Sequence, residues 1–306
     1  MCLPAEQVDQ FLRIFLRLLF FTNQKLQVVP SLATEPPGHD VDWEAAMKVR
    51  DALWQHEELL DAYVAQNPDQ FSPEDMVIAK SWKYRVEGRF IIFKELKKYA
   101  IFIAHGGVPD VYAVHCLTHS FEEISPDERM PTLVEAVLLP FHGVIVADGL
   151  FDAFNIPYSP EIRADLKAIY DDASERGEII TSLVPSEQPP SREALAAKAE
   201  ATNAKVLQAF SKYESRAGRS TKIVERDGAM VEQFAQALLL GGPEPISLRD
   251  FNDIDLEGFV DGLSEVEAKT ARLSLRRFLS FLRDTERMDW GEAQSMIEIV
   301  LGRVSP

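Results

Sequence analysis

The chain of 306 residues is poor in the residue types that form cross-links, metal sites and catalytic triads. It contains two cysteines, Cys2 near the N-terminus and Cys116 in an apolar stretch, which excludes a disulfide framework and a four-cysteine zinc site. We interpret Cys116 as a small buried apolar residue. The sequence also lacks a Gly-x-Ser-x-Gly elbow and a glycine-rich phosphate loop, so it indicates neither a nucleophilic triad nor a nucleotide site. The low cysteine content fits a reducing cytoplasm.

Long hydrophobic runs are absent as well. The most apolar stretch, Phe11–Phe21, is interrupted by Arg13 and Arg17, is too short to span a bilayer, and is followed by no small-residue cleavage site. On a helical wheel the two arginines form a narrow polar strip opposite a broad apolar face. We therefore predict a mostly buried helix and no membrane-embedded segment. Attachment to a membrane surface and pairing with a partner helix are the alternatives.

Basic residues are fewer than acidic ones. The chain has 32 lysines and arginines against 49 aspartates and glutamates, which gives a formal net charge of −17. An acidic balance of this size repels nucleic acid and anionic lipid at long range, although a local basic patch can overcome it. Solubility alone also explains such acidity. Because of the long-range repulsion, nucleic acid is disfavoured as a partner.

The patterning of what is present predicts an α+β protein. Residues 85–155 contain about five short apolar segments separated by charged or Gly/Pro breaks, which is typical of an antiparallel meander. We expect a small antiparallel meander sheet or a partly open barrel packed by helices, with a helix at about 160–176. An all-α bundle follows. The predicted domains are 1–184, a linker and bridging helix at 185–218, and a helical bundle at 219–306.

Several helix starts can be located from capping residues. Ser72 before Pro73 fits an N-cap followed by a first-turn proline. Two further Ser/acid pairs, at 247/250 and 264/267, have the spacing of a capping box. These signals predict where helices begin, and they carry no chemistry.

Two stretches, SWKYRVEGRFIIFKELKKYAIFI at 81–103 and TLVEAVLLPFHGVIVADGLF at 132–151, resemble those of a family of uncharacterised prokaryotic proteins. In that family a Trp-Lys…Gly-x-Phe strand and a Lys-Lys-Tyr strand precede a Leu-Leu-Pro-Phe…Asp-Gly-Leu hairpin. NPDQFSPED at 67–75 and EIITSL at 178–183 extend the likeness to roughly residues 40–185. The resemblance implies no activity. His142 also stands where the family has a basic residue.

The region 228–302 is weakly similar to the helical core-binding domain of tyrosine recombinases. The similarity is carried by MVEQFAQALLL, LRDFNDIDLEGFVDGL and LSLRRFLSFLRDTERMDW. It consists of helix lengths and one Arg-Phe-Leu-x-Phe-Leu stretch. It implies a helical fold.

Carboxylates gather in the predicted hairpin and in the helix after it. Glu135, Asp148 and Asp152 are candidates for a metal-assisted hydrolase, because paired carboxylates bind Mg²⁺ or share acid and base roles. Asp148 fits turn chemistry equally well, and Asp171 and Asp172 fit a solvated helix face.

Three histidines, His105, His115 and His119, lie near Cys116 in the metal-like cluster of the sequence. Because neighbouring residues of a strand point to opposite faces, His115 and Cys116 meet one metal only where the strand ends. Polar residues beside a loop are the alternative interpretation. We predict no metal and no cofactor.

Four arginines lie on one side of the last long predicted helix, beside its apolar face: Arg272, Arg276, Arg283 and Arg287. At about 100° per residue they fall within a sector of roughly 60°. Such a ridge suits phosphate contacts with nucleic acid. It equally suits ion pairs with acidic neighbours, here Asp250, Asp253, Asp255 and Glu257.

No credible catalytic set emerges from a well-patterned two-domain chain. The sequence therefore favours a cytoplasmic, non-catalytic protein-interaction or regulatory module that binds a protein partner or self-associates. A metal-dependent hydrolase using Asp148, Asp152 and Glu135 is one alternative. A nucleic-acid-associated protein using the C-terminal arginine ridge is the other.

Overall fold

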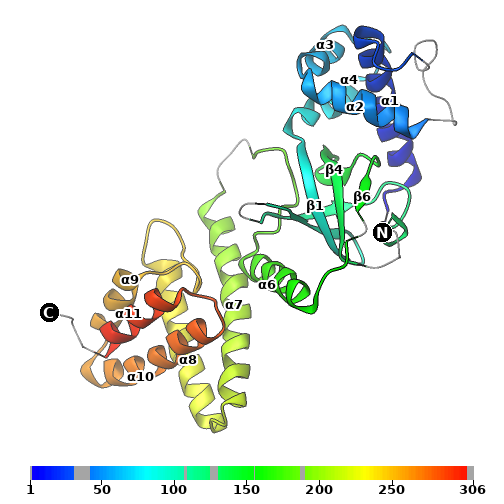
Figure 1. Ribbon diagram of the computed structural model, residues 1–306. Coiled ribbons are helices and arrows are strands. Elements are labelled where there is room, and N and C mark those ends of the chain that lie inside the picture. The colour runs from blue at the N-terminus through cyan, green and yellow to red at the C-terminus, as the bar shows by residue number, and fades with distance from the viewer. Residues whose placement is uncertain are drawn as a thin grey trace. The chain divides into compact units, whose positions relative to one another are not determined.

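The computed structural model describes residues 2–30, 42–106, 109–124, 130–154, 156–186 and 190–301. The chain divides into two compact units. Met1–Tyr170 and Ile179–Pro185 form the first, and Asp171–Glu178 and Ser186–Pro306 form the second. We call them the sheet unit and the helical unit (Figure 1).

The sheet unit begins with four helices: α1 (Ala5–Leu26), α2 (Trp43–Gln55), α3 (Glu58–Gln66) and α4 (Pro73–Ser81). The predicted start of α4 is confirmed, because the Ser72 hydroxyl accepts a hydrogen bond from the Asp75 N–H at 3.1 Å. The apolar face of α1 is buried, as the helical wheel predicted, and Phe11 and Leu18 are fully buried. The stretch 11–21 is thus a core helix of this unit.

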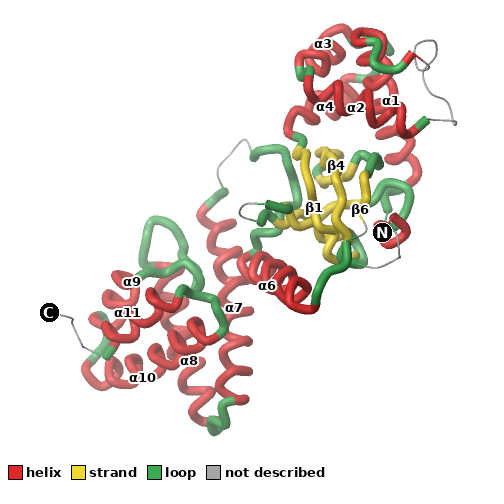
Figure 2. The backbone as a smooth tube through the Cα atoms, in the orientation of Figure 1, coloured by secondary structure: helices red, strands yellow, loops and turns green. Residues whose placement is uncertain are grey.

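The six strands are β1 (Val86–Glu95), β2 (Ala100–Ala104), β3 (Val111–His115), β4 (Thr132–Phe141), β5 (Val144–Ala147) and β6 (Asp152–Phe154). They form one sheet in the order β1-β2-β3-β5-β4-β6, and an additional β1–β4 pairing makes the sheet ring-like (Figure 2). The predicted α+β class is confirmed. The strand pairing differs from the predicted meander: β3 and β5 run parallel, and β4 pairs with β1 and with β6.

Both faces of this sheet carry apolar cores. Alternate residues of β4, such as Val137 and Leu139, pack with the helices α1–α4. The intervening residues, such as Val134 and Leu138, pack on the opposite face with Phe90 and with the short helix α5 (Phe121–Ile124). Two-sided burial explains why the strand sequences are almost continuously apolar.

A disulfide between Cys2 and Cys116 closes the sheet unit, contrary to the expectation of two unpaired cysteines. The N–H of Leu3 donates to the carbonyl of Cys116 at 3.0 Å, which brings the Cα atoms of the two cysteines within 4.6 Å. The residues are 114 positions apart, so their proximity depends on the folded sheet. Cys116 is buried, as predicted.

Helix α6 (Pro160–Arg176) crosses the boundary between the units. In its sheet-unit part, Tyr170 packs on Phe93, and the ammonium of Lys94 lies 3.5 Å from the Tyr170 ring centroid. In its helical-unit part, Asp172 and Glu175 form ion pairs described below. Asp172, which the sequence predicts to lie on a solvated helix face, is thus partly engaged in ion pairing.

The helical unit contains α7 (Arg192–Arg216), α8 (Thr221–Leu240), α9 (Asp253–Asp261), α10 (Glu265–Asp284) and α11 (Trp290–Val300). The predicted capping box at the start of α10 is confirmed in both directions, between Ser264 and Glu267. Helix α7 contributes Val206 and Phe210 to the core of this unit, although its sequence suggests a bridging helix. Few apolar residues suffice there because they share one stripe.

Candidate functional site

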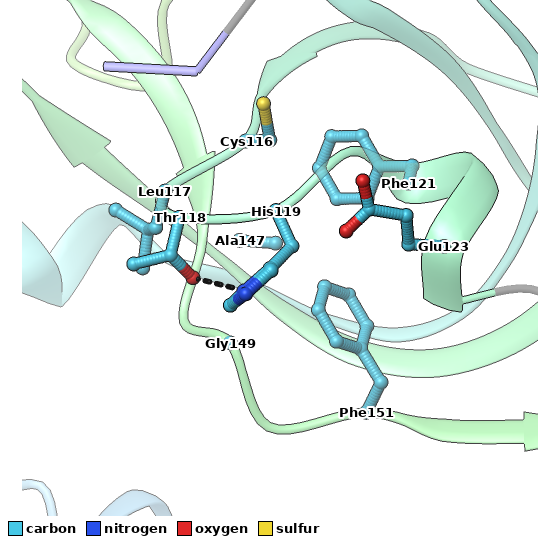
Figure 3. Close-up of a pocket in the computed structure, with 9 residues that line it drawn as sticks. All are labelled: Cys116, Leu117, Thr118, His119, Phe121, Glu123, Ala147, Gly149 and Phe151. Atoms are coloured by element: carbon cyan, nitrogen blue, oxygen red, sulfur yellow. Dashed lines mark hydrogen bonds between the residues drawn. The ribbon is translucent and has the colours of Figure 1, made fainter. Parts of the chain in front are cut away.

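A cavity of about 420 Å³ opens where β3 ends. Its polar lining comes from Thr118, His119 and Glu123, and its apolar lining includes Phe121 and Phe151 (Figure 3). The ring of His119 lies against the hydroxyl of Thr118, with a distance of 2.8 Å between Oγ1 and Nδ1. The cavity therefore holds a single histidine whose nearest polar neighbour is a hydroxyl.

The three histidine candidates do not converge on this cavity. His105 is exposed, and its backbone N–H donates a hydrogen bond to the Arg89 backbone carbonyl at 2.9 Å. His115 is partly buried and lies with its ring centroid 6.0 Å from that of Tyr99, and burial lowers the pKa of His115. Within the described ranges, no three His, Cys, Asp or Glu residues are placed to hold a metal ion.

The carboxylate candidates separate into one buried and two exposed groups. Asp148 is buried, and its Oδ2 accepts a hydrogen bond from Nη1 of Arg50 at 3.1 Å. Its Oδ1 accepts the Leu150 N–H at 3.0 Å. Burial raises the pKa of Asp148 to about 6, and the Arg50 guanidinium and the Leu150 N–H oppose that shift. Both oxygens are thus occupied by the protein's own donors.

Glu135 and Asp152 face each other across β4 and β6 in directly opposed register. Both are exposed, and Glu135 accepts a hydrogen bond from Nε of Arg89 at 3.2 Å on the neighbouring strand. Like charges opposed in a sheet repel, and Arg89 offsets that repulsion. The arrangement stabilises a sheet edge, and it leaves Asp148 outside the pair.

Three of the four ridge arginines lie on α10, whereas Arg287 lies beyond the end of this helix at Asp284, and most of the four are engaged within the helical unit. Arg287 donates to both oxygens of Glu175, with Nη2 and Oε2 2.7 Å apart. Arg283 pairs with Asp284, and Arg272 donates to the carbonyl of Val300 at 3.2 Å. Arg276 is exposed and has no ion-pair partner among the described residues. The ridge is thus not a continuous free basic surface.

The ion pairs of this unit join different residues from those proposed from sequence. Buried Arg249 pairs with Asp172 and Glu175, and Arg176 pairs with Asp250 at 2.8 Å. These ion pairs therefore involve the last two turns of α6 rather than α9. Further ion pairs lie inside the bundle, where Asp227 is fully buried and pairs with Arg226 and Arg277.

Asp227 receives hydrogen bonds from Ser274, Arg226 and Arg277. Burial acts to raise its pKa, but these three donors outweigh burial and hold the pKa of Asp227 below its ordinary value. A carboxylate with this many charged donors stays ionised inside a core. It is a structural ion cluster.

Another feature of the helical unit is a groove of about 360 Å³ between the C-terminal end of α8 and the helix α9. Leu238, Ile246 and Phe259 form its apolar walls. Ile254 also lines it, with 74% of its surface exposed. We call this feature the α8–α9 groove.

Gly258 keeps the α8–α9 groove open. It lies in the interior of α9, where glycine costs about 1 kcal/mol relative to alanine. A Cβ built at this position would meet no atom within 4 Å, so packing does not require a glycine there. The missing side chain instead leaves space on the groove side of the helix.

One carboxylate belongs to the groove lining, and two others, Glu244 and Asp253, lie within two residues of lining residues along the chain. Asp255 lines the groove and also caps α9, where it accepts the Asn252 N–H at 3.0 Å. None of the three has a basic partner within 4.0 Å in the part of the chain that the structure describes. Sequence reasoning treated two of these acids as partners for the arginine ridge and missed the groove, because its walls meet only in the folded bundle.

Comparison with known proteins provides no further guide. No family model matches the chain, and neither the curated proteins nor the solved structures contain a significant match. Among the described residues, no helix has the length and apolarity needed to cross a membrane.

Proposed function

We propose that this chain is a non-catalytic protein-interaction module and that its binding surface is the α8–α9 groove. The observation that carries the proposal is the combination of an exposed Ile254, an open groove and flanking carboxylates without basic partners. Exposed apolar surface rimmed by polar groups is typical of interaction sites. Internal packing does not account for this combination.

The carboxylates considered for a hydrolase favour a non-catalytic role, because two of them already have partners within the protein. Asp148 has both oxygens occupied, and Glu135 is paired with Arg89. A hydrolase built on them would require Mg²⁺, Mn²⁺ or Zn²⁺ to raise the thermal stability of the full chain. A nucleic-acid role would require salt-sensitive duplex binding that depends on Arg276. We expect neither effect.

The test is quantitative enrichment from native-host lysate with the tagged full chain and two variants. Ile254→Ser removes the exposed apolar contact from the groove, and Val77→Ser removes an equally exposed aliphatic side chain from α4. We expect a partner that is retained by the wild type and by Val77→Ser and is lost with Ile254→Ser. Equal recovery by all three proteins, or recovery of no specific partner, would refute the proposal.

We also propose a cytoplasmic location, which makes a separate prediction about the Cys2–Cys116 pair. Cytosolic reductants keep most protein thiols reduced. Rapid alkylation in lysed cells should therefore label both cysteines. A fully oxidised pair would place the protein in an oxidising compartment.

A further inference from the structure

The α8–α9 groove has the chemistry to recognise one kind of partner. We infer that its occupant is a basic amphipathic helix, which places a large apolar side chain in the groove and lysine or arginine side chains beside Glu244, Asp253 and Asp255. This inference rests on the proposed function and names the partner's chemistry.

The apolar requirement follows from the groove walls. Leu238, Ile246 and Phe259 present hydrocarbon surface, and the volume of about 360 Å³ lies in the range of small binding pockets. The side chain of Ile254 extends the apolar surface outward from α9. Large leucine- or phenylalanine-like side chains gain most from removing such surface from water.

The basic requirement follows from the carboxylates. Glu244, Asp253 and Asp255 carry negative charge with no basic side chain of this chain paired to them in the described residues. They stand on a molecule whose net charge is −17. A cationic partner is therefore attracted at long range and is paired on arrival, whereas anionic partners are repelled.

The same charges argue against other occupants. Nucleic acid and anionic membranes would bring phosphate groups against the groove carboxylates. A second copy of this chain would bring another acidic surface. Of its ridge arginines, Arg276 alone has a guanidinium with neither an ion pair nor a hydrogen bond among the described residues, so the ridge of a second copy offers little free positive charge to the groove carboxylates. An amphipathic helix seated through apolar side chains three and four residues apart matches a groove with helical walls.

The probe is a fluorescent synthetic helix of about 16 residues with leucine along one face and lysine elsewhere. Binding to the full chain is followed by anisotropy at low and high salt. Two companion peptides isolate the two requirements: one replaces lysine with glutamate, and the other replaces leucine with alanine. We expect both companion peptides to bind at least about tenfold more weakly, the first because of charge and the second because of lost burial.

Two double variants of equal charge locate the site. Glu244→Gln/Asp253→Asn neutralises two acids next to the groove lining, and Glu225→Gln/Glu232→Gln neutralises two exposed acids in the first half and near the middle of α8. We expect the first to weaken binding of the lysine-leucine helix about tenfold at low salt and the second to weaken it less than twofold. Equal loss in both would mean attraction by net charge alone and would overturn the inference.

The outcomes separate this inference from the proposed function. If a native partner depends on Ile254 but the lysine-leucine helix neither binds nor competes with it, the groove is an interaction surface with another occupant, and this inference fails. If the helix binds but no native partner depends on Ile254, the proposed function fails. A dimer in sedimentation that is lost with Ile254→Ser would replace the basic helix with a second copy.

Discussion

Each unit of this protein contains a buried aspartate paired with arginine, Asp148 in the sheet unit and Asp227 in the helical unit, and the pKa values of the two shift in opposite directions. In the sheet unit, Asp148 has one guanidinium and one backbone N–H, and burial raises its pKa to about 6. In the helical unit, Asp227 has two guanidinium groups and a hydroxyl, and its pKa is lowered. At Asp227 the two guanidinium groups and the hydroxyl outweigh burial, whereas at Asp148 burial outweighs the single guanidinium and the backbone N–H.

The same contrast extends to the surface. Glu135 of the sheet unit is paired with Arg89, whereas Asp253 and Asp255 beside the α8–α9 groove have no basic partner in the described chain. A carboxylate that stabilises its own fold is a poor candidate for binding. Unpaired carboxylates next to open apolar surface, as at the α8–α9 groove, are better candidates.

The largest predicted effect comes from breaking the Asp148 pair. Arg50→Met leaves Asp148 buried without its cation, and we expect the free energy of unfolding to fall by about 3–5 kcal/mol at neutral pH. Adding Asp148→Asn should recover part of that loss because it removes the buried charge. Urea unfolding measures both. Lys48→Ala on the same helix breaks an exposed, solvent-screened pair and should lower the free energy of unfolding far less than Arg50→Met. A similar cost for Arg50→Met and Lys48→Ala would contradict the account.

The second effect is a pH dependence of opposite sign in the two units. The folded pKa of Asp148, about 6, lies above its unfolded value of 3.8, so its contribution to stability falls as pH rises from about 4 to 6. The shift of about two pKa units corresponds to about 3 kcal/mol. The pKa of Asp227 is depressed, so its contribution is lost as pH falls below the unfolded value.

Urea unfolding at several pH values, with a separate probe for each unit, measures this dependence. Asp148→Asn should flatten the profile of the sheet unit between pH 4 and 6. An unchanged profile in that variant would show that Asp148 is not the titrating group.

The third effect concerns the inner ion cluster. Asp227→Asn keeps the shape of the side chain but removes the charge that faces Arg226 and Arg277. We expect a loss of about 2–3 kcal/mol, because hydrogen bonds to charged groups are strong and the two cations lose their partner. Glu232→Gln on the same helix is exposed and serves as the control, with less than about 0.5 kcal/mol expected. Chemical denaturation measures the free energy of unfolding of both variants, and equal losses would contradict the role of the Asp227 charge.

The smallest effect sharpens the interpretation of the groove. Gly258→Ala should raise the free energy of unfolding by about 0.5–1 kcal/mol, because alanine is the better helix former and its Cβ meets no neighbour. Thermal unfolding measures the change. Destabilisation would mean that packing, rather than an open groove, explains this glycine.

The sequence predicted the elements whose causes are local. Ser72 and the Ser264/Glu267 pair cap helices as their spacing indicates. Ser247 and Asp250 have the same spacing, but their side chains bond to each other in a turn. Spacing alone cannot distinguish these outcomes, because the following residues decide whether a helix continues.

Features formed by distant residues escaped prediction. The Cys2–Cys116 bond spans 114 positions, and the parallel pairing of β3 with β5 depends on where the chain returns after β4. The α8–α9 groove likewise requires Leu238 and Phe259 to meet across a connecting segment. Periodicity reports which face of one helix is apolar and does not report which two faces leave a space between them.

The most direct test of the account is a calorimetric titration of the lysine-leucine helix into the wild type and into Gly258→Leu. This substitution fills the groove from a position with free space and alters no charge. We predict that it weakens binding at least about tenfold, while the Gly258→Ala variant binds within about threefold of the wild type. Full-strength binding to Gly258→Leu would contradict the claim that the α8–α9 groove is the binding surface.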